Sequence, residues 1–306
     1  MKEFFPEYYK NFKCIADKCT HNCCIGWEIN VDDETMHRYK KMNNEMGKKI
    51  LENISVDSQS FVLTADEKCP FLMKNGLCEI ITECGNEYLC NICSLHPRFK
   101  NFYTSFVETG LGLCCEEACR LILTDKDKFK IKIDSDIFLT DEEEEFIIIR
   151  QDIFSILQNR NKSVYDRLVE LANKFGLEFL FDTQKLYDLY TSLERLDSNW
   201  SQKLENLKNL DFNMDIFHRE DMQLLFEQLS VYFVFRHLSE AIWDSDYSCW
   251  ISFVLVSVFV IGMLFSYYTY DLKTFDFEKA YDLVRMYSSE IEYSDENINK
   301  IIDFIN

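Results

Sequence analysis

Thirteen cysteines are the residues of this 306-residue sequence best suited to chemistry. All but Cys249 lie between Cys14 and Cys119. Cys90-x-x-Cys93 has the spacing that lets two neighbouring thiolates point at one metal ion. Four thiolates satisfy a tetrahedral zinc ion or a [4Fe–4S] cluster, so the number of ligands does not separate the two. The sequence therefore predicts a first third folded around thiolate-bound metal, with an iron–sulfur cluster favoured over zinc.

Disulfides and unliganded thiols are the alternatives to metal. The N-terminus has no apolar signal core, so we expect a cytoplasmic protein, where dense cysteines serve metal or redox chemistry. The odd number of cysteines also prevents complete pairing. Within the adjacent pairs Cys23-Cys24 and Cys114-Cys115, we expect one member to be a core residue. Four further cysteines can equally be buried small hydrophobic residues: Cys84, Cys90, Cys119 and Cys249.

The turn signals near the cysteines predict local geometry. Asn75-Gly76 is the strongest hairpin signal in the chain, and it would bring Cys69 and Cys78 to adjacent positions. His21 and His96 also lie among the cysteines, but the thiolates already suffice as ligands. The run Trp27–Val31 alternates apolar and polar residues like a short strand.

The composition favours helices, because glycine (8) and proline (3) are scarce. We predict a mainly α fold: a Cys-rich metal-binding region with short strands and a hairpin at 1–125, followed by an all-α domain at 126–306. Asp32 or Asp33 is expected to cap a helix that runs to about Ile54. Further helices are expected from residue 141, from Ser163 to a stop at Gly176, and over 182–196, 219–242, 276–288 and 295–305.

The stretch Cys249–Tyr270 carries no charge and is long enough to span a membrane. A helix buried at the centre of an all-α domain explains the same pattern. Because no basic flank sets an orientation, we predict the buried helix and no membrane association.

The net charge of −20 disfavours nucleic acid and anionic membrane surfaces as partners. It serves solubility, or it attracts a lysine-bearing partner. The sequence contains no P-loop, no Gly-x-Gly-x-x-Gly after a strand and no His-Glu-x-x-His. Cys19-x3-Cys23 begins the three-cysteine run of radical S-adenosylmethionine enzymes, but Gly26 occupies its third position.

The cysteine motifs follow one another in a long ordered series over residues 8–125. The series is Cys14, Cys19, Cys23-Cys24-x-x-Trp27, Cys69-Pro70-Phe71-Leu72, Gly76-Leu77-Cys78-x-Ile80, Cys93-x-x-x-Pro97-Arg98 and Cys115-x-Glu117-Ala118-x-Arg120-Leu121. It resembles the flagellin lysine N-methylase family and the wider eight-cysteine family of zinc- or iron-chelating proteins. Ser163–Gly176 and Tyr232–Arg236 are similar to the helical half of the flagellin-modifying members, which the shorter chelating proteins lack.

The resemblance implies methyl transfer from S-adenosylmethionine to lysine side chains of flagellin by an enzyme with a [4Fe–4S] cluster. The implied metal ligands are Cys14, Cys19, Cys23, Cys24, Cys69, Cys78, Cys93 and Cys115. Arg98 and Arg120 lie beside such cysteines and are candidates to pair with the cluster's negative charge or with the donor's carboxylate. An ordinary ion pair is the structural alternative for both arginines. The alternative function is a non-enzymatic, zinc-stabilised protein-binding scaffold.

Overall fold

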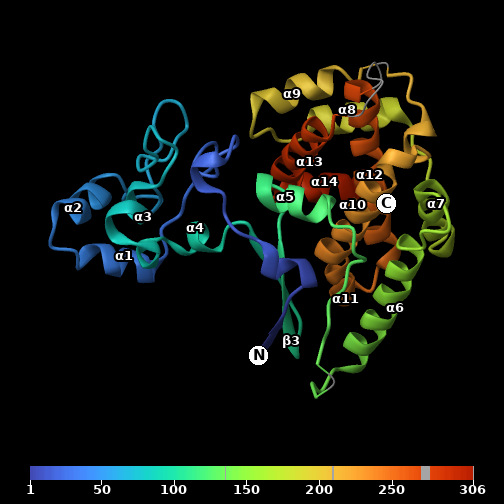
Figure 1. Ribbon diagram of the computed structural model, residues 1–306, viewed down its shortest axis with the longest axis horizontal. Helices are drawn as coiled ribbons and strands as arrows, with labels where there is room; N and C mark the ends of the chain where they lie inside the picture. The colour runs from blue at the N-terminus through green and yellow to red at the C-terminus, as the bar shows by residue number, and fades with distance from the viewer. Residues whose placement is uncertain (135, 209, 270–275, 306) are drawn as a thin grey trace. The chain divides into compact units, whose positions relative to one another are not determined.

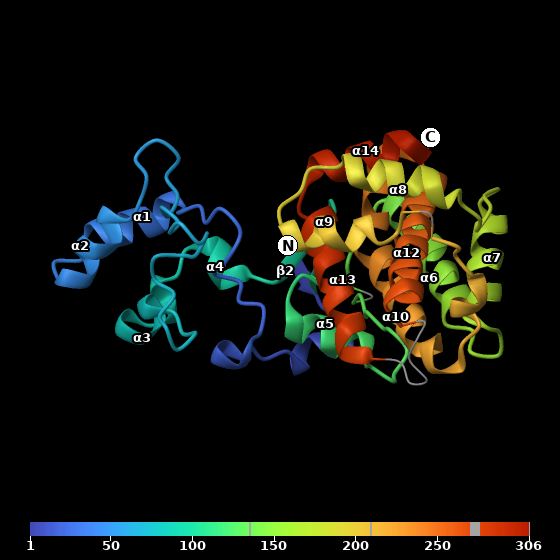
Figure 2. The same cartoon turned by 90° about the horizontal axis from the view of Figure 1, so that it is seen from above.

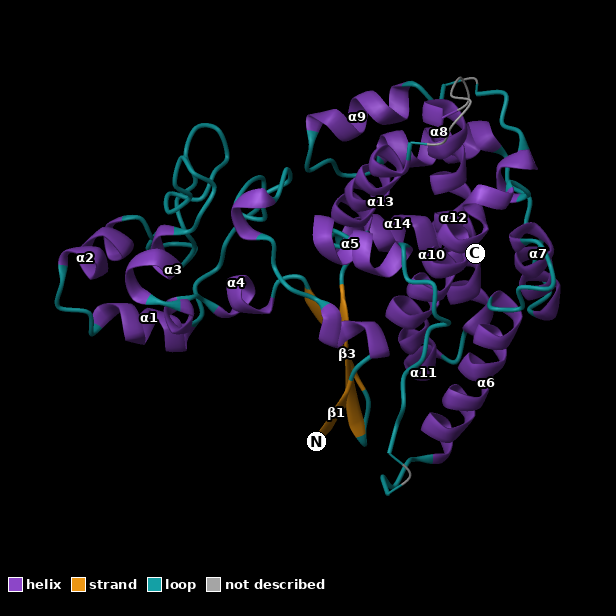
Figure 3. Cartoon of the chain, in the orientation of Figure 1, coloured by secondary structure: helices purple, strands orange, loops and turns teal. Residues whose placement is uncertain are grey.

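The computed structural model describes residues 1–134, 136–208, 210–269 and 276–305, and it divides the chain into two compact units (Figure 1). The Cys-rich unit comprises residues 13–98 and 115–117, and the helical unit comprises the rest of the described chain. The predicted fold class is confirmed: the chain is mainly α-helical, with a Cys-rich N-terminal region and a few short strands (Figure 3). Residues 118–125 lie in the helical unit, and the domain division at residue 125 stays a prediction.

The helices of the Cys-rich unit are short: α1 (Asp33–Lys40), α2 (Glu45–Glu52), α3 (Glu79–Cys84) and α4 (Asn91–Leu95). The prediction of one helix from Asp32 to about Ile54 is wrong, because the segment forms two helices, α1 and α2, with a break between them. Asp32 does cap α1, but the helix ends at Lys40 and α2 begins under a new cap. The Asn44 side chain accepts the N–H of Gly47 at 2.8 Å. Asparagine favours such caps over helix interiors because its side chain competes for backbone hydrogen bonds.

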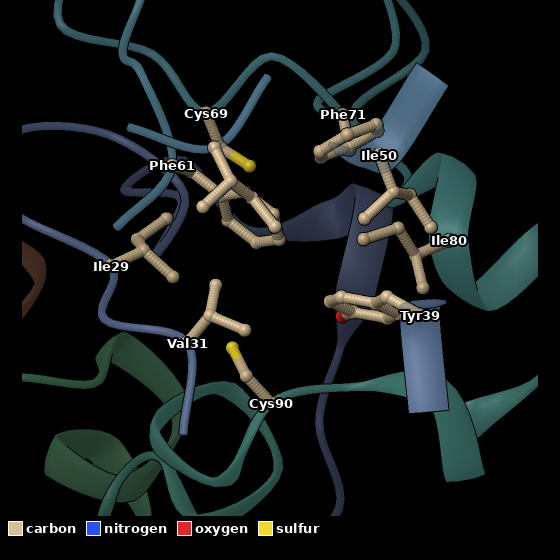
Figure 4. Close-up of a cluster of buried hydrophobic side chains, with 10 residues drawn as sticks. Ile29, Val31, Tyr39, Ile50, Phe61, Cys69, Phe71, Ile80 and Cys90 are labelled. Carbon is tan, nitrogen blue, oxygen red and sulfur yellow. The ribbon is translucent and has the colours of Figure 1, made fainter. Parts of the chain in front are cut away.

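Two cysteines belong to the small hydrophobic core of the Cys-rich unit (Figure 4). The core residues are Ile29, Val31, Tyr39, Ile50, Ile54, Phe61, Cys69, Phe71, Ile80 and Cys90. Ile29 and Val31 are buried while Glu28 and Asn30 are exposed, which is the predicted alternation. The segment is extended, but it pairs through an isolated bridge between Asn30 and Ser60 rather than as a named strand.

A three-stranded sheet lies at the start of the helical unit. Its strands are β1 (Lys2–Phe4), β2 (Arg98–Phe102) and β3 (Phe106–Leu111), in the order β1-β3-β2. β1 runs parallel to β3, with Lys2 opposite Phe106. Every residue of β3 is buried, so this central strand joins the sheet to the helices.

The remaining helices build the helical unit, apart from the first two residues of α5, which belong to the Cys-rich unit (Figures 1 and 2). They are α5 (Glu116–Leu123), α6 (Asp141–Leu157), α7 (Val164–Lys174), α8 (Thr183–Ser192), α9 (Ser198–Glu205), α10 (Gln223–His237), α11 (Ala241–Asp244), α12 (Tyr247–Thr269), α13 (Phe277–Ile291) and α14 (Asp295–Ile305). The predicted cap at Ser163 is confirmed, and Gly176, with φ +71°, follows the end of α7. The helix predicted over 219–242 is interrupted by 3-10 turns on both sides of α10.

Helix α12 is long and apolar enough to cross a membrane, yet 89% of its most apolar stretch is buried. It contacts α7, α10, α13 and α14 and lies among them in Figure 2. The prediction of a buried helix is confirmed for residues 251–266, all of which are buried, and Tyr270 lies outside the described residues.

Candidate metal centre

Six thiols of the Cys-rich unit come from separate segments and interact electrostatically with one another. We call them the six-thiol group: Cys23, Cys24, Cys69, Cys78, Cys90 and Cys93. A main-chain hydrogen bond joins the segment of Cys23 and Cys24 to that of Cys69, since the N–H of Cys69 donates to the carbonyl of Cys24 at 2.8 Å. The Asn22 amide donates to the Gly76 carbonyl at 3.1 Å while its oxygen accepts the N–H of Cys24 at 2.9 Å.

The predicted hairpin at Asn75-Gly76 is confirmed. Leu72 pairs with Cys78 across it, and the N–H of Gly76 donates to the carbonyl of Met73 at 2.9 Å. Gly76 has φ +82°, a conformation that glycine adopts without a steric penalty. The hairpin carries Cys69 at one end and Cys78 at the other, and their two thiols interact.

Cys78 and Cys90 each stand just before a short helix. The Cys78 sulfur accepts N–H groups of Ile80 and Ile81 at the start of α3, and the Cys90 sulfur accepts the N–H of Cys93 in α4. Such N–H groups stabilise negative charge on sulfur. At Cys90 the contact with Cys93 and this N–H lower the pKa, whereas at Cys78 burial outweighs the N–H groups and raises the pKa.

Neighbouring thiols also bond in pairs. The sulfurs of Cys90 and Cys93 are 3.4 Å apart. A hydrogen bond from Cys24 lowers the pKa of Cys23 to about 7, and the same bond raises the pKa of Cys24 well above the usual thiol range. The contact with Cys93 likewise lowers the pKa of Cys90. Each pair thus contains one sulfur that ionises more readily than its partner.

A second set of thiols comprises Cys14, Cys19 and Cys115, which we call the three-thiol group. Burial, followed by the charges of Glu116 and the neighbouring thiols, raises the pKa of Cys19 to about 12. One Glu116 oxygen accepts the N–H and hydroxyl of Thr20 at 2.8 and 2.7 Å and the N–H of His21 at 3.1 Å. This carboxylate holds the segment of Cys115 against the loop that follows Cys19.

The nine thiols of the two groups are of a chemical type that binds metal. Soft thiolates are the donors that zinc and iron–sulfur clusters use. Within the described ranges, however, no three His, Cys, Asp or Glu side chains stand close enough to hold one ion.

The eight cysteines predicted as ligands fall into both groups. Five are in the six-thiol group, and the other three make up the three-thiol group. Cys90 was not among the predicted eight, although it belongs to the six-thiol group. Its Cys-x-x-Cys spacing with Cys93 was the signal that could have included it. The assignment of all eight as ligands stays a prediction.

The other cysteines lie elsewhere. The Cys114 thiol donates to the Tyr293 hydroxyl at 3.0 Å in the helical unit, so the adjacent pair Cys114-Cys115 is divided between the two units. Cys119 and Cys249 are buried in α5 and α12. Cys84 is at the end of α3, where burial and then Glu83 and Glu87 raise its pKa.

The histidine and arginine candidates have protein partners. Burial, followed by the charge of Arg98, lowers the pKa of His96 to about 4, so this imidazole is neutral at pH 7. Arg98 also donates to the His96 carbonyl at 3.4 Å. Arg120 on α5 pairs with Glu278 at 3.4 Å in the helical unit. The cofactor-binding roles of the two arginines stay predictions.

Comparison with known proteins finds relatives in Salmonella. The chain is 28% identical over 130 residues to the flagellar biosynthetic protein FliU of Salmonella muenchen, which covers 40% of this chain and 77% of that protein. It is 28% identical over 130 residues to the lysine-N-methylases of Salmonella choleraesuis and Salmonella typhimurium. That alignment covers 40% of this chain and 32% of each lysine-N-methylase.

The resemblance to flagellin lysine N-methylases, predicted from the cysteine motifs, is thereby confirmed. The chain spans about a third of the length of the lysine-N-methylases that it matches. No family model and no solved structure matches the chain.

Proposed function

We propose that this protein is a cytoplasmic protein-lysine N-methyltransferase that acts on flagellin and holds a [4Fe–4S] cluster in its Cys-rich unit. The observation that carries the proposal is the similarity to proteins named lysine-N-methylase and FliU. The gathering of nine thiols in one small unit supports the metal. Thiols remain reduced in the cytoplasm, which supports the compartment.

The proposed reaction moves a methyl group from the sulfonium of S-adenosylmethionine to the Nζ atom of lysine. The S–CH3 bond breaks as the N–CH3 bond forms, and the donor leaves as a neutral thioether. Lysine has an unperturbed pKa of about 10.4, so its ammonium must lose a proton before it attacks. The site must therefore bind the amine in its neutral form or supply a base.

The cluster ligands would come from the six-thiol and three-thiol groups. When bound, a [4Fe–4S] cluster would cross-link loops that bury little apolar surface, and an open iron would act as a Lewis acid. The protein's own thiols contribute by ionising, which the contact with Cys93 favours at Cys90.

The test uses the full chain purified without oxygen. We expect a brown protein with a broad visible absorption, stoichiometric iron and sulfide, and incorporation of labelled methyl groups into flagellin lysines. No transfer to flagellin in the presence of intact cluster and S-adenosylmethionine would overturn the enzymatic proposal. Colourless protein with stoichiometric zinc and no transfer would favour the scaffold function instead.

A further inference from the structure

Cys90 and Cys93 hold their sulfurs at a separation that suits one metal ion. The two sulfurs are 3.4 Å apart. Two thiolates on one tetrahedral zinc ion, each about 2.3 Å from the metal, lie about 3.8 Å apart. In a [4Fe–4S] cluster the four cysteines are spread over four irons, so neighbouring ligand sulfurs lie farther apart. A shift of about 0.4 Å would place this pair on a single ion, whereas a cluster would require the two sulfurs to separate.

The start of α4, which carries the pair, is held by the Asp32 side chain of the preceding helix. One oxygen of its carboxylate accepts the N–H of Thr35 at 3.0 Å and caps α1. The other oxygen accepts the N–H of Asn91 at 2.8 Å, directly after Cys90. A single carboxylate therefore joins the two helices and fixes the backbone beside Cys90.

The backbone before Cys90 is held from the same helix. The Tyr39 hydroxyl of α1 donates to the Tyr88 carbonyl at 2.7 Å, two residues before Cys90. The Tyr39 side chain is fully buried, so this hydrogen bond lies in the core of the unit. With Asp32 on one side and Tyr39 on the other, the protein itself sets the position of the pair. Such outer partners are what orient the ligands of protein metal sites.

The Asn75-Gly76 hairpin brings two further thiols to the same core. Cys69 and Cys90 are both core residues, and their sulfurs point toward its interior (Figure 4). Cys78 and Cys93 pack against the core. The thiols of Cys69 and Cys78 each interact electrostatically with that of Cys90. Structural zinc sites are closed sites with four such ligands.

The other predicted ligands are in a different environment. Cys14 and Cys23 are exposed, and Cys19 and Cys115 are partly exposed. Within the described Cys-rich unit, none of these four belongs to the core. Cys24 packs against the core, but its thiol is hydrogen-bonded to Cys23. The unit thus contains thiols of two kinds, four in the core and five on the loops.

We propose that Cys69, Cys78, Cys90 and Cys93 bind one soft divalent cation, zinc, at a site separate from the cluster of the proposed function. The Cys90–Cys93 pair supplies two donors that are already near ligand separation, and the hairpin supplies the other two. Each thiol gives up its proton to solvent when it binds. Cys90 is a ligand of this site although it is not one of the eight predicted cysteines, and the loop thiols remain for the cluster.

Metal analysis of the full chain tests the site, with protein purified without oxygen from medium that contains both zinc and iron. We expect stoichiometric zinc in addition to the iron of the cluster. Cys90→Ala should lose the zinc and keep the iron. Cys84→Ala, at the end of α3 in the same unit, is the matched control and should keep both metals. Wild-type protein without zinc would overturn the proposal, and so would zinc retained in Cys90→Ala, since Cys90 would then serve only in packing.

Asp32→Asn tests the positioning without removing a thiol. Asparagine has one acceptor oxygen, so it can cap α1 or hold the start of α4 but not both. Zinc transfer to a chromophoric chelator should become about tenfold faster, as the loss of an outer partner of a metal site does, with the iron content unchanged. Asp33→Asn makes the same change at the exposed neighbour and should keep the wild-type rate. If Cys90→Ala loses both metals, this rate decides, and equal rates for Asp32→Asn and the wild type would overturn the site.

The zinc site and the proposed function can fail separately. Zinc that depends on Cys90, in a protein with neither cluster nor methyl transfer, would keep the single-ion site and remove the proposed function. A cluster with methyl transfer to flagellin, in a protein that binds no zinc, would keep the proposed function and remove the site.

Discussion

The Cys-rich and helical units differ in the length of their helices. The longest helices of the Cys-rich unit, α1 and α2, have 8 residues, whereas α12 of the helical unit has 23. Isolated helices shorter than about 12 residues are marginal in water, so the Cys-rich unit depends on other contacts. Two of its core residues are themselves cysteines, Cys69 and Cys90.

The units also differ in what they bury. The helical unit buries complete ion pairs: the two terminal nitrogens of Arg150, Nη1 and Nη2, contact Glu108 at 2.7 and 2.6 Å, and Arg167 contacts Glu227 at 2.6 Å. Among the described residues of the Cys-rich unit, the buried polar side chains are the uncharged Thr35 and Ser60. The helical unit supplies its own counter-charges, whereas in the proposed function a bound metal would supply the cation for thiolates of the Cys-rich unit.

The largest effect is expected from removal of a hairpin cysteine. Cys69→Ala or Cys78→Ala should lose metal and stability together, because ligand loss is coupled to folding. Structural zinc contributes an apparent free energy of about 10 kcal/mol or more in small metal domains, so we expect the Cys-rich unit to unfold. Metal analysis and thermal melting of the anaerobic protein measure both effects.

The matched control for this prediction is Cys119→Ala in the helical unit. Cys119 is buried in α5 and should cost only the packing of one small side chain, with metal retained. If Cys69→Ala and Cys78→Ala kept their metal and their melting temperature, the hairpin would not supply ligands. The contrast between the two units would then lose its chemical basis.

The second effect concerns the buried ion pair of the helical unit. Arg150→Met leaves the Glu108 carboxylate buried without its cation, which typically costs about 3–5 kcal/mol. Adding Glu108→Gln should recover part of this loss, because the buried charge is then gone. Lys162→Met is the control, since its pair with Glu170 is exposed and should contribute less than about 1 kcal/mol. Chemical denaturation measures all three, and equal losses for Arg150→Met and Lys162→Met would contradict the assignment.

The third effect is a pH dependence that belongs to the helical unit. Glu290 accepts the N–H groups of Leu196 and Asp197 at 2.9 and 2.7 Å, and burial raises its pKa to about 7. The pKa of Glu290 is higher in the folded protein than in the unfolded chain. Its contribution to the free energy of unfolding is therefore fully present below about pH 4 and is lost as the pH rises through 7. The loss amounts to at most about 3 kcal/mol.

Glu290→Gln removes this titration, so the free energy of unfolding of the variant should fall less than that of the wild type between pH 5 and 8. The readout is the difference in slope, because the substitution also changes one hydrogen bond at every pH. Asp295→Asn, at the exposed start of α14, is the control and should keep the wild-type slope. Parallel curves for Glu290→Gln and the wild type would show that burial does not raise this pKa.

Local sequence signals predicted much of the helical unit. Three of these signals are the acidic residues Asp141–Glu144 in the first turn of α6, the Ser163 cap of α7 and the uncharged stretch of α12. Each signal lies within or beside the helix that it predicts. The fold class and the hairpin followed from equally local patterns. Such signals are independent of tertiary contacts, and that is why they were visible in the sequence.

Contacts between distant segments could not be predicted in the same way. The division of Cys114 from Cys115 depends on Tyr293, which is 179 residues away from Cys114, and on the hydrogen bonds that Thr20 donates to Glu116. The break between α1 and α2 was missed because the amphipathic pattern continues across it, while the Asn44 cap interrupts the backbone. Cys90 is different. Its Cys-x-x-Cys spacing with Cys93 is visible in the sequence, but its interactions with thiols of more distant segments are not.

The smallest effect concerns the start of α6. The Thr140 hydroxyl accepts the N–H of Glu143 at 3.3 Å, and the Glu143 carboxylate accepts the N–H of Thr140 at 2.9 Å. Thr140→Ala should therefore cost about 1 kcal/mol of unfolding free energy, with metal content unchanged. Ser155→Ala, in the interior of the same helix, should change stability by less than about 0.5 kcal/mol, since alanine suits helix interiors. A loss of metal in Thr140→Ala would show that the Cys-rich unit depends on the helical unit for its stability, which the contrast in their buried charges does not predict.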